Sequence, residues 1–395
     1  MYNYAHYILD ENMTQITGTN NKSINEWIYR GRIPYLDGFR AIAILSVIFY
    51  HIGGQYHYYI LDRIFDGQLG VTLFFVISGF LITLLLLREH DRNNQISIVD
   101  FYKRRFLRIF PAYYSYLIIM CGLYFMHVIN FPYFYWIGAF TYSICYFPDI
   151  PRAWFLAHTW SLAVEEHFYL LWPIIILIFT PKKAYKILIG FLILTPIIRI
   201  FVLHITHSTI SVQFYSITQM GSIAIGCLLA FCVYSPSFAN IKDVLVKYPK
   251  IILSSGILIL FLSKLVHTFN HGLLLHIFHN SLIVKDIASI YIVGFYDPVN
   301  AFGFALIISG CLFLHSAILN KLLNNKVIVH IGVLSYSLYL WQQPFTYSNS
   351  FLMKFHWFIL LFVIYIVALC SYKFIETPFL KIKEKQSSSN TILNR

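Results

Sequence analysis

The stretch Leu36-Asp-Gly-Phe-Arg-Ala-Ile-Ala-Ile-Leu-Ser-Val-Ile-Phe-Tyr-His51 places two ionisable side chains, Arg40 and His51, inside one apolar run. An ionisable residue within a membrane-spanning helix costs about 3 kcal/mol on insertion scales and usually marks function. Eleven residues at about 100° each make roughly three turns, so both side chains lie on one helix face, about 16 Å apart along the axis. Two interpretations stay open. The strip lines a passage with chemistry at the His51 end, or Arg40 merely pairs with Asp37 and His51 lies at the membrane surface.

The composition indicates a polytopic membrane protein. Of the 395 residues, 58% are hydrophobic and only 12% are charged, about half the charged share of a soluble domain. The net charge of +12 comes from short basic clusters between apolar runs, which is the pattern of cytoplasmic loops and not of a nucleic-acid-binding surface. The six cysteines are scattered without the paired spacing of a metal site, so we expect no metal.

Apolar runs of spanning length predict an all-α membrane bundle of about ten transmembrane helices. The aromatic segment 128–159 has an apolar run too short to span comfortably, so it is predicted to be an extracytoplasmic loop or a re-entrant segment. The membrane domain is then 33–380, between cytoplasmic tails at 1–32 and 381–395. The predicted spans lie near residues 33–53, 69–89, 106–127, 160–180, 184–204, 214–234, 250–267, 301–319, 327–345 and 355–374.

The distribution of Lys and Arg supports this topology, with both termini in the cytoplasm. If 128–159 were a span, every later loop would lie on the opposite side of the membrane, and the excess of Lys and Arg on the cytoplasmic side would be lost. In the predicted topology the outer loops hold only four basic residues, Arg63, Arg152, Lys285 and Lys354.

The same topology places Glu165 and Glu166, in the motif Trp160–Pro173, at about the depth of His51. One of the two carboxylates would hold the imidazole in a useful tautomer, as in a catalytic dyad. The alternative is that both glutamates form packing interactions, for example with Arg199 or Lys264.

Two further motifs contain residues suited to binding a ligand. Ser78 and Gly79 lie within a dense apolar span, where small residues let a ligand or simply another helix approach the backbone. Arg104, Arg105 and Arg108 follow helical spacing at a predicted cytoplasmic surface. Arginines so placed bind phosphates bidentately, although contact with lipid headgroups would also account for them.

Taken together, these motifs resemble the acyltransferase 3 family, in order and over roughly residues 32–382. The matching stretches are Leu36–His51, Phe75–Phe80, Arg104–Pro111, Trp160–Glu166, Leu334–Trp341 and Phe374–Phe379.

The resemblance implies a bacterial inner-membrane enzyme embedded among lipids. Such enzymes move an acyl group, commonly acetyl, from cytoplasmic acyl-CoA to a hydroxyl of an extracytoplasmic glycan, such as lipopolysaccharide or another cell-surface or lipid-linked acceptor. Acyl-CoA is then a co-substrate, and no permanently bound cofactor is expected. The family's catalytic histidine falls on His51, and its acyl-CoA contacts fall on Arg40, Arg104, Arg105 and Arg108, with Ser78 and Gly79 as further candidates.

The chain departs from the family pattern in two places. Gln342 follows Leu-Trp where the family often has histidine, and Gln219 and Gly221 replace an expected arginine and acidic residue. We therefore assign none of these three a proton-transfer role.

The residues permit a mechanism in which His51 acts as general base, while Glu165 or Glu166 orients it. A covalent acyl-histidine intermediate is a variant. The rival function is a secondary transporter, which would show inverted halves or helices broken at matching positions. The aromatic side chains of 128–159 either stack on sugar rings or form an interfacial belt. These side chains are Phe131, Tyr133, Phe134, Tyr135, Trp136, Tyr142 and Trp154.

Overall fold

The computed structural model describes residues 26–29, 33–56, 64–147, 149–271, 290–314, 316–347 and 356–382. The chain divides into two units, Met1–Pro34 and Tyr35–Arg395. The described helix of the first unit is α2 (Glu26–Tyr29). Most of the two predicted tails, 1–32 and 381–395, lies outside the described residues.

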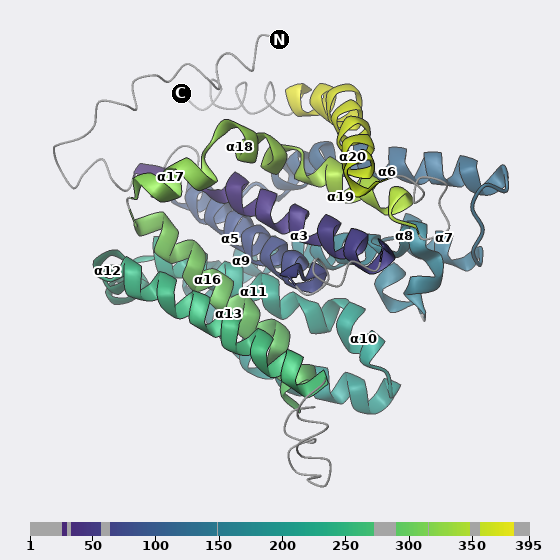
Figure 1. The fold of residues 1–395 in the computed structure, drawn as a ribbon. Helices are drawn as coiled ribbons and strands as arrows, with labels where there is room; N and C mark the ends of the chain where they lie inside the picture. Colours follow the sequence, from purple (N-terminus) through teal and green to yellow (C-terminus); the bar gives the residue numbers. More distant parts are fainter. Residues whose placement is uncertain are drawn as a thin grey trace, which may run out of the picture. The chain divides into compact units, whose positions relative to one another are not determined.

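The second unit is helical, and its described residues contain no β-strand. The predicted all-α class is therefore confirmed. The main helices, shown in Figure 1, are α3 (Leu36–Tyr56), α5 (Gly67–Asn93), α6 (Ile98–Phe125), α7 (Phe134–Phe140), α8 (Trp154–Ala157), α9 (Thr159–Thr206), α10 (Thr209–Phe214), α11 (Ser216–Tyr234), α12 (Ala239–Lys247), α13 (Pro249–His271), α16 (Tyr296–Phe313), α17 (Ala317–Leu323), α18 (Lys326–Val333), α19 (Ser335–Phe345) and α20 (Trp357–Ser371). Shorter elements are the 3₁₀ turns η2 (Ile144–Tyr146), η3 (Ile150–Ala153) and η4 (Pro236–Phe238), and the π-helical turns η5 (Tyr291–Phe295) and η7 (Tyr372–Glu376).

Eight helical stretches of the described chain are long and apolar enough to cross a membrane. One of them contains α9, whose 48 residues would extend about 72 Å if straight, more than twice the hydrocarbon thickness of about 30 Å. The backbone leaves the helical region inside α9 at Thr180, with φ 59° and ψ 158°, at the end of the predicted span 160–180. The predicted span 327–345 is divided between α18 and α19, neither of which is long enough to cross alone. The exact number of ten spans stays a prediction.

Helices α5 and α11 touch through their backbones in the interior. A Cβ atom on Gly79 would collide with the carbonyl oxygen of Ile223, and one on Gly226 with the carbonyl oxygen of Val76. Small residues are what allow two membrane helices to approach this closely. Helix packing therefore accounts for Gly79, and it fixes the position of Ser78 beside it.

The segment 128–159 folds into short helices, α7, η2, η3 and α8, instead of one long crossing helix. Several of its aromatic side chains are buried, among them Tyr135 and Tyr142. Tyr142 stacks on Tyr113 with ring centroids 4.4 Å apart, and the Tyr135 hydroxyl donates to the carbonyl of Asp149 at 3.0 Å. Tyr135 and Tyr142 therefore fit neither predicted alternative, sugar stacking or an interfacial belt, because both pack into the protein core.

Candidate active site

His51 lies in the last part of α3, and an amide of α19 holds its imidazole. Nδ1 of His51 is 2.8 Å from Oε1 of Gln342. The other end of that amide is fixed, because Nε2 of Gln342 donates to Oε1 of Gln343 at 3.0 Å. The oxygen of Gln342 therefore faces the ring as an acceptor, which favours the tautomer with hydrogen on Nδ1 and a lone pair on Nε2. That is the form of imidazole that acts as a general base.

The indole of Trp154 packs against the His51 ring. The ring centroids are 5.7 Å apart in an edge-on arrangement. Trp154 Nε1 donates to the backbone carbonyl of Gln343 at 2.9 Å, so the segment 128–159 is fastened to the helix that holds His51. Sequence reasoning placed Trp154 among the aromatic side chains of 128–159 but did not predict this contact.

A second imidazole, that of His158, is buried near His51. Only 4% of His158 is exposed, and it lies within electrostatic range of His51. Its ring packs between Tyr116 and Tyr339, with centroid distances of 5.4 and 5.6 Å. Neither ring nitrogen has a hydrogen-bond partner among the described residues. Sequence reasoning missed His158, although it stands two positions before the quoted motif that begins at Trp160.

The two glutamates do not hold His51. Glu165 Oε1 instead accepts a hydrogen bond from Ser78 of α5 at 2.7 Å. In the described part of the chain, neither Glu165 nor Glu166 is hydrogen-bonded to the imidazole, whose partner is Gln342. The predicted dyad is wrong in this respect, because similar depth in the bundle does not decide which way a side chain points around its helix. A catalytic role for either carboxylate stays a prediction.

Of the arginines predicted to bind acyl-CoA, some form an ion pair with a carboxylate of the protein and others do not. Arg40 is paired with Asp37, with NH1 to Oδ1 at 3.0 Å. This pair is the one that the second interpretation of the Leu36–His51 stretch predicted. Arg104 is paired with Glu89, with NH2 to Oε2 at 2.8 Å. Both therefore have a carboxylate partner that already satisfies part of the guanidinium.

Arg105 and Arg108 are the more open members of the basic cluster. Arg105 lies over the ring of Tyr169, 4.4 Å from its centroid. Arg108 lies within electrostatic range of Arg40, Arg105 and Glu376, so two of the other three predicted arginines lie near it. No described residue forms an ion pair or hydrogen bond with the Arg108 guanidinium.

Glu376 is a further candidate that the sequence motif contained but that was assigned no role. It ends the π-helical turn η7 and accepts a short hydrogen bond from Ser337 of α19. Single π-helical turns inside α-helices occur frequently at functional sites. Glu376 thus gives the arginine cluster a buried carboxyl neighbour, bonded to the helix that also carries Gln342.

The polar side chains of the candidate site keep accessible surface. Arg108 is exposed, and Glu165, Glu166 and His51 are half-buried. Charged and titratable groups on α3, α6 and α9 are therefore accessible to a ligand.

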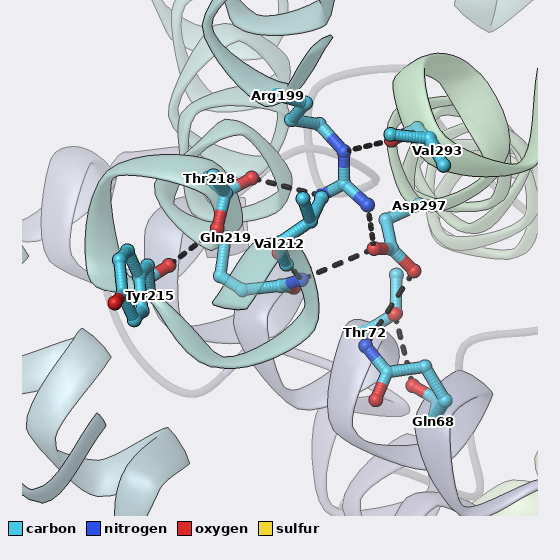
Figure 2. A network of polar contacts seen from close by, with 9 residues as sticks. All are labelled: Gln68, Thr72, Arg199, Val212, Tyr215, Thr218, Gln219, Val293 and Asp297. Atoms are coloured by element: carbon cyan, nitrogen blue, oxygen red, sulfur yellow. Dashed lines mark hydrogen bonds and ion pairs between the residues drawn. The ribbon is translucent and has the colours of Figure 1, made fainter. Parts of the chain in front are cut away.

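A second polar network, drawn in Figure 2, occupies the junction of α9, α11 and α16. Arg199 donates from Nε to the carbonyl of Val293 at 2.6 Å, from NH1 to the carbonyl of Thr218 at 2.9 Å and from NH2 to Oδ2 of Asp297 at 2.6 Å. Gln219 adds a 3.1 Å bond to the same Asp297 oxygen. The side chains of Arg199 and Asp297 are only 4% and 7% exposed, so this network is closed.

Both predicted alternative partners of the glutamates are thereby occupied elsewhere. Arg199 pairs with Asp297, and Nζ of Lys264 lies 2.6 Å from Oδ2 of Asp66. Gln219, one of the departures from the family pattern, serves this structural network.

Comparison with known proteins agrees with the motifs. Residues 33–372 match the sequence profile of the family described as Acyltransferase domain. The chain belongs to this acyltransferase family. The matched range contains every predicted site residue and also Gln342, whereas Glu376 follows it.

Similar acyltransferases include the O-acetyltransferase OatA of Staphylococcus aureus strains NCTC 8325 and COL, at 32% identity over 376 residues. A putative O-acetyltransferase of strain COL is 32% identical over 381 residues. In each case the match covers 88% of this chain and 57% of the relative, so the chain spans little more than half the length of these relatives. No solved structure matches the chain.

Proposed function

We propose that this acyltransferase is a membrane O-acetyltransferase that moves an acyl group, most simply acetyl, from acyl-CoA to a hydroxyl of a glycan. The observation that carries the proposal is the His51–Gln342 contact, because it leaves the Nε2 lone pair of His51 free to accept a proton. Family membership and the naming of its relatives as O-acetyltransferases support the same reaction class.

The donor end of the reaction is assigned to the arginine cluster. Coenzyme A carries phosphates, and guanidinium groups bind phosphates through paired N–H donors. Arg108 has no described partner of its own and lies close to Arg40 and Arg105. We place the phosphates there, with the pantetheine arm running along α3 over the roughly 16 Å between Arg40 and His51.

The transfer step uses His51 as general base. Nε2 takes the proton of the acceptor hydroxyl while its oxygen attacks the thioester carbonyl. A C–O bond forms, the C–S bond breaks, and the departing thiolate recovers the proton from the imidazolium. Gln342 acts as a positioning residue that keeps Nδ1 protonated. Proton transfer by a placed imidazole is worth about 10²- to 10⁴-fold in rate.

The topology that fits this reaction is the one predicted from the charges. We propose a multi-pass protein of the bacterial inner membrane, with a membrane domain over 33–380, about ten spans and both tails in the cytoplasm. The arginine cluster then meets cytoplasmic acyl-CoA, and His51 lies near the extracytoplasmic face where a cell-surface or lipid-linked glycan is reached.

The test is acetyl-CoA turnover by the purified full chain in nanodiscs, with His51→Ala beside the wild type. His127→Asn is a matched control, because His127 is exposed in the turn after α6 and has a positive φ that asparagine tolerates. We expect slow hydrolysis or transfer by the wild type and the control, and a loss of at least 100-fold in His51→Ala at equal thermal stability.

Each contrary result has a distinct meaning. Turnover retained in His51→Ala would keep the enzyme and remove His51 as its base. Absence of binding and turnover with acetyl-CoA and longer acyl-CoA in the wild type would overturn the proposed function and favour the transporter.

A further inference from the structure

A cavity of about 260 Å³ opens beside the end of α9, and His51 is not among its lining residues. Its volume is slightly below the usual range for sites that hold drug-sized ligands, about 300–1,000 Å³. The wall comes from the segment 128–159, from the end of α9 and from α10. The lining residues are Cys145, Phe147, Asp149, Thr206, Ser208, Ile210, Ser211, Phe214 and Tyr215.

The cavity lies at the His51 end of the bundle. The ring of Phe214 packs on Trp160, with centroids 4.9 Å apart, in the first turn of α9. Asp149, another lining residue, is five residues before Trp154, whose indole contacts His51. One short segment therefore contributes both to the cavity wall and to the cover of the catalytic imidazole.

The lining combines aromatic rings with hydroxyl and carboxylate groups. Phe147, Phe214 and Tyr215 are half-buried and supply ring faces, while Asp149 is exposed at the mouth. The hydroxyls of Thr206, Ser208 and Ser211 add donors and acceptors. A pyranose ring has the complementary surface, because its C–H face is apolar and its hydroxyls project around the edge. Pockets that orient a ligand typically combine apolar walls with a few placed polar groups in this way.

The floor beneath the cavity is held by a chain of polar contacts. Sγ of Cys145 lies 3.3 Å from Oγ of Ser216, and the same hydroxyl lies 2.7 Å from Nδ1 of His167. Tyr146 stacks over the His167 ring at 5.8 Å. Burial raises the pKa of the Cys145 thiol, so this wall presents a neutral thiol and no nucleophilic thiolate.

The position of Asp149 is also fixed before any ligand arrives. Its backbone has a φ of 50°, and its carbonyl accepts the Tyr135 hydroxyl at 3.0 Å. A group that is ordered in advance loses little conformational entropy on binding, which favours affinity. Arg152, the ion-pair neighbour of Asp149, is 3.7 Å away, and its side chain is 72% exposed. The carboxylate therefore keeps acceptor capacity for ligand hydroxyls.

We propose that this cavity binds one neutral sugar ring of the acceptor glycan and so presents a neighbouring hydroxyl to His51. The assignment of that glycan as acceptor rests on the proposed function, whereas binding of the sugar does not. Because Asp149 is the one charged residue among the described residues that line the cavity, sugars bearing carboxylates bind less well than neutral ones.

The experiment measures sugar binding directly, by saturation-transfer NMR and calorimetry on the full chain in nanodiscs. The probes are a β-1,4-linked N-acetylglucosamine tetramer, a neutral glucose tetramer and an anionic galacturonate tetramer. Ser211→Phe fills the cavity, Ser211→Ala is its matched control, and Asp149→Asn removes the carboxylate at a φ that asparagine tolerates.

We expect at least one neutral tetramer to bind the wild type. Ser211→Phe should weaken its binding at least tenfold, Asp149→Asn about fivefold, and Ser211→Ala less than threefold. The galacturonate tetramer should bind at least tenfold more weakly than the neutral one. The thermal unfolding midpoint of Ser211→Phe, measured in nanodiscs beside Ser211→Ala, shows whether this variant is folded.

The failures of the two proposals are distinguishable. Acetyl-CoA turnover without binding of any neutral tetramer, or with binding unaffected by Ser211→Phe, overturns the cavity assignment alone. If the protein never turns over acyl-CoA but binds a sugar, and Ser211→Phe abolishes that binding, the sugar site is kept and the transferase proposal is overturned. If Ser211→Phe does not fold, the contrast between Asp149→Asn and the wild type decides.

Discussion

Arg199 and Arg108 are both arginines in helices of a membrane bundle, but their surroundings differ. Arg199 is 3% exposed, and its three nitrogens donate to two carbonyls and the Asp297 carboxylate. Arg108 is exposed, has no described hydrogen-bond partner and lies near two other arginines as well as Glu376.

The difference shows that an ionisable residue in a membrane helix indicates function only when its bonding capacity is left open. A buried, fully paired charge is arranged for the fold, and removing one partner leaves the other uncompensated. A charge with unused donors and like-charged neighbours is costly unless an anion from outside completes it. The closed network stabilises the bundle, and the open cluster is the better candidate for binding.

The largest expected effect comes from opening the closed network. Arg199→Met leaves the Asp297 carboxylate buried without its cation, which should lower the free energy of unfolding by about 3–5 kcal/mol. Thermal and SDS unfolding of the purified protein measure the change. The double variant Arg199→Met/Asp297→Leu removes both charges and should recover most of the loss. A single variant as stable as the wild type would contradict the structural role of this pair.

The next effect concerns the orientation of the base. Gln342→Leu removes the acceptor for Nδ1–H, so kcat for acetyl transfer should fall about 10- to 100-fold, or about 1.4–2.7 kcal/mol in barrier, with little change in KM for acyl-CoA. Gln342→Glu supplies another acceptor and should retain more activity than the leucine variant. The pH dependence of kcat is the decisive measurement. Equal activity of the wild type and Gln342→Leu at every pH would show that His51 needs no orienting partner.

A smaller effect is expected from the open cluster itself. Arg108→Ala removes one charged hydrogen-bond donor set for phosphate, so KM for acetyl-CoA should rise about tenfold, equivalent to about 1.4 kcal/mol. The unfolding midpoint should not fall, in contrast to Arg199→Met. Arg108→Lys should be intermediate, because lysine keeps the charge but not the paired donors. A stability loss without a change in KM would place Arg108 in the structural class with Arg199.

The smallest effect is predicted for Arg104. Its pairing with Glu89 is partly exposed, and such pairs contribute about 0–1 kcal/mol. Arg104→Ala should therefore change KM for acetyl-CoA less than twofold and leave stability within error. A rise in KM as large as that of Arg108→Ala would return Arg104 to the donor site predicted from its spacing.

Much of the architecture could be predicted from the sequence, because composition and apolar run length determine a helical membrane bundle. Local pairs were also accessible, since Arg40 and Asp37 are three residues apart on one face. Collinear motifs sufficed for the family. The kink at Thr180 stands immediately before Pro181, and proline disrupts a helix interior.

The side-chain contacts within the candidate site could not be predicted from the sequence in the same way. The predicted topology gave the depth of His51 and Glu165 in the membrane, but it did not give the rotation of each helix about its axis. That rotation directs the Glu165 side chain toward Ser78. The Gln342 contact joins residues 291 positions apart, and glutamine was unexpected where the family often has histidine. His158 shows no pattern of its own, because only its burial without partners distinguishes it.

The contact between Trp154 and His51 bears on the electrochemical gradient across the membrane. A continuous polar space through a membrane conducts protons and ions, and would dissipate the electrochemical gradient. The indole of Trp154, bonded to the Gln343 carbonyl and packed on the imidazole, places a bulky, largely apolar ring beside His51. Where the proposed passage reaches His51, this ring narrows it and limits the flow of protons and ions.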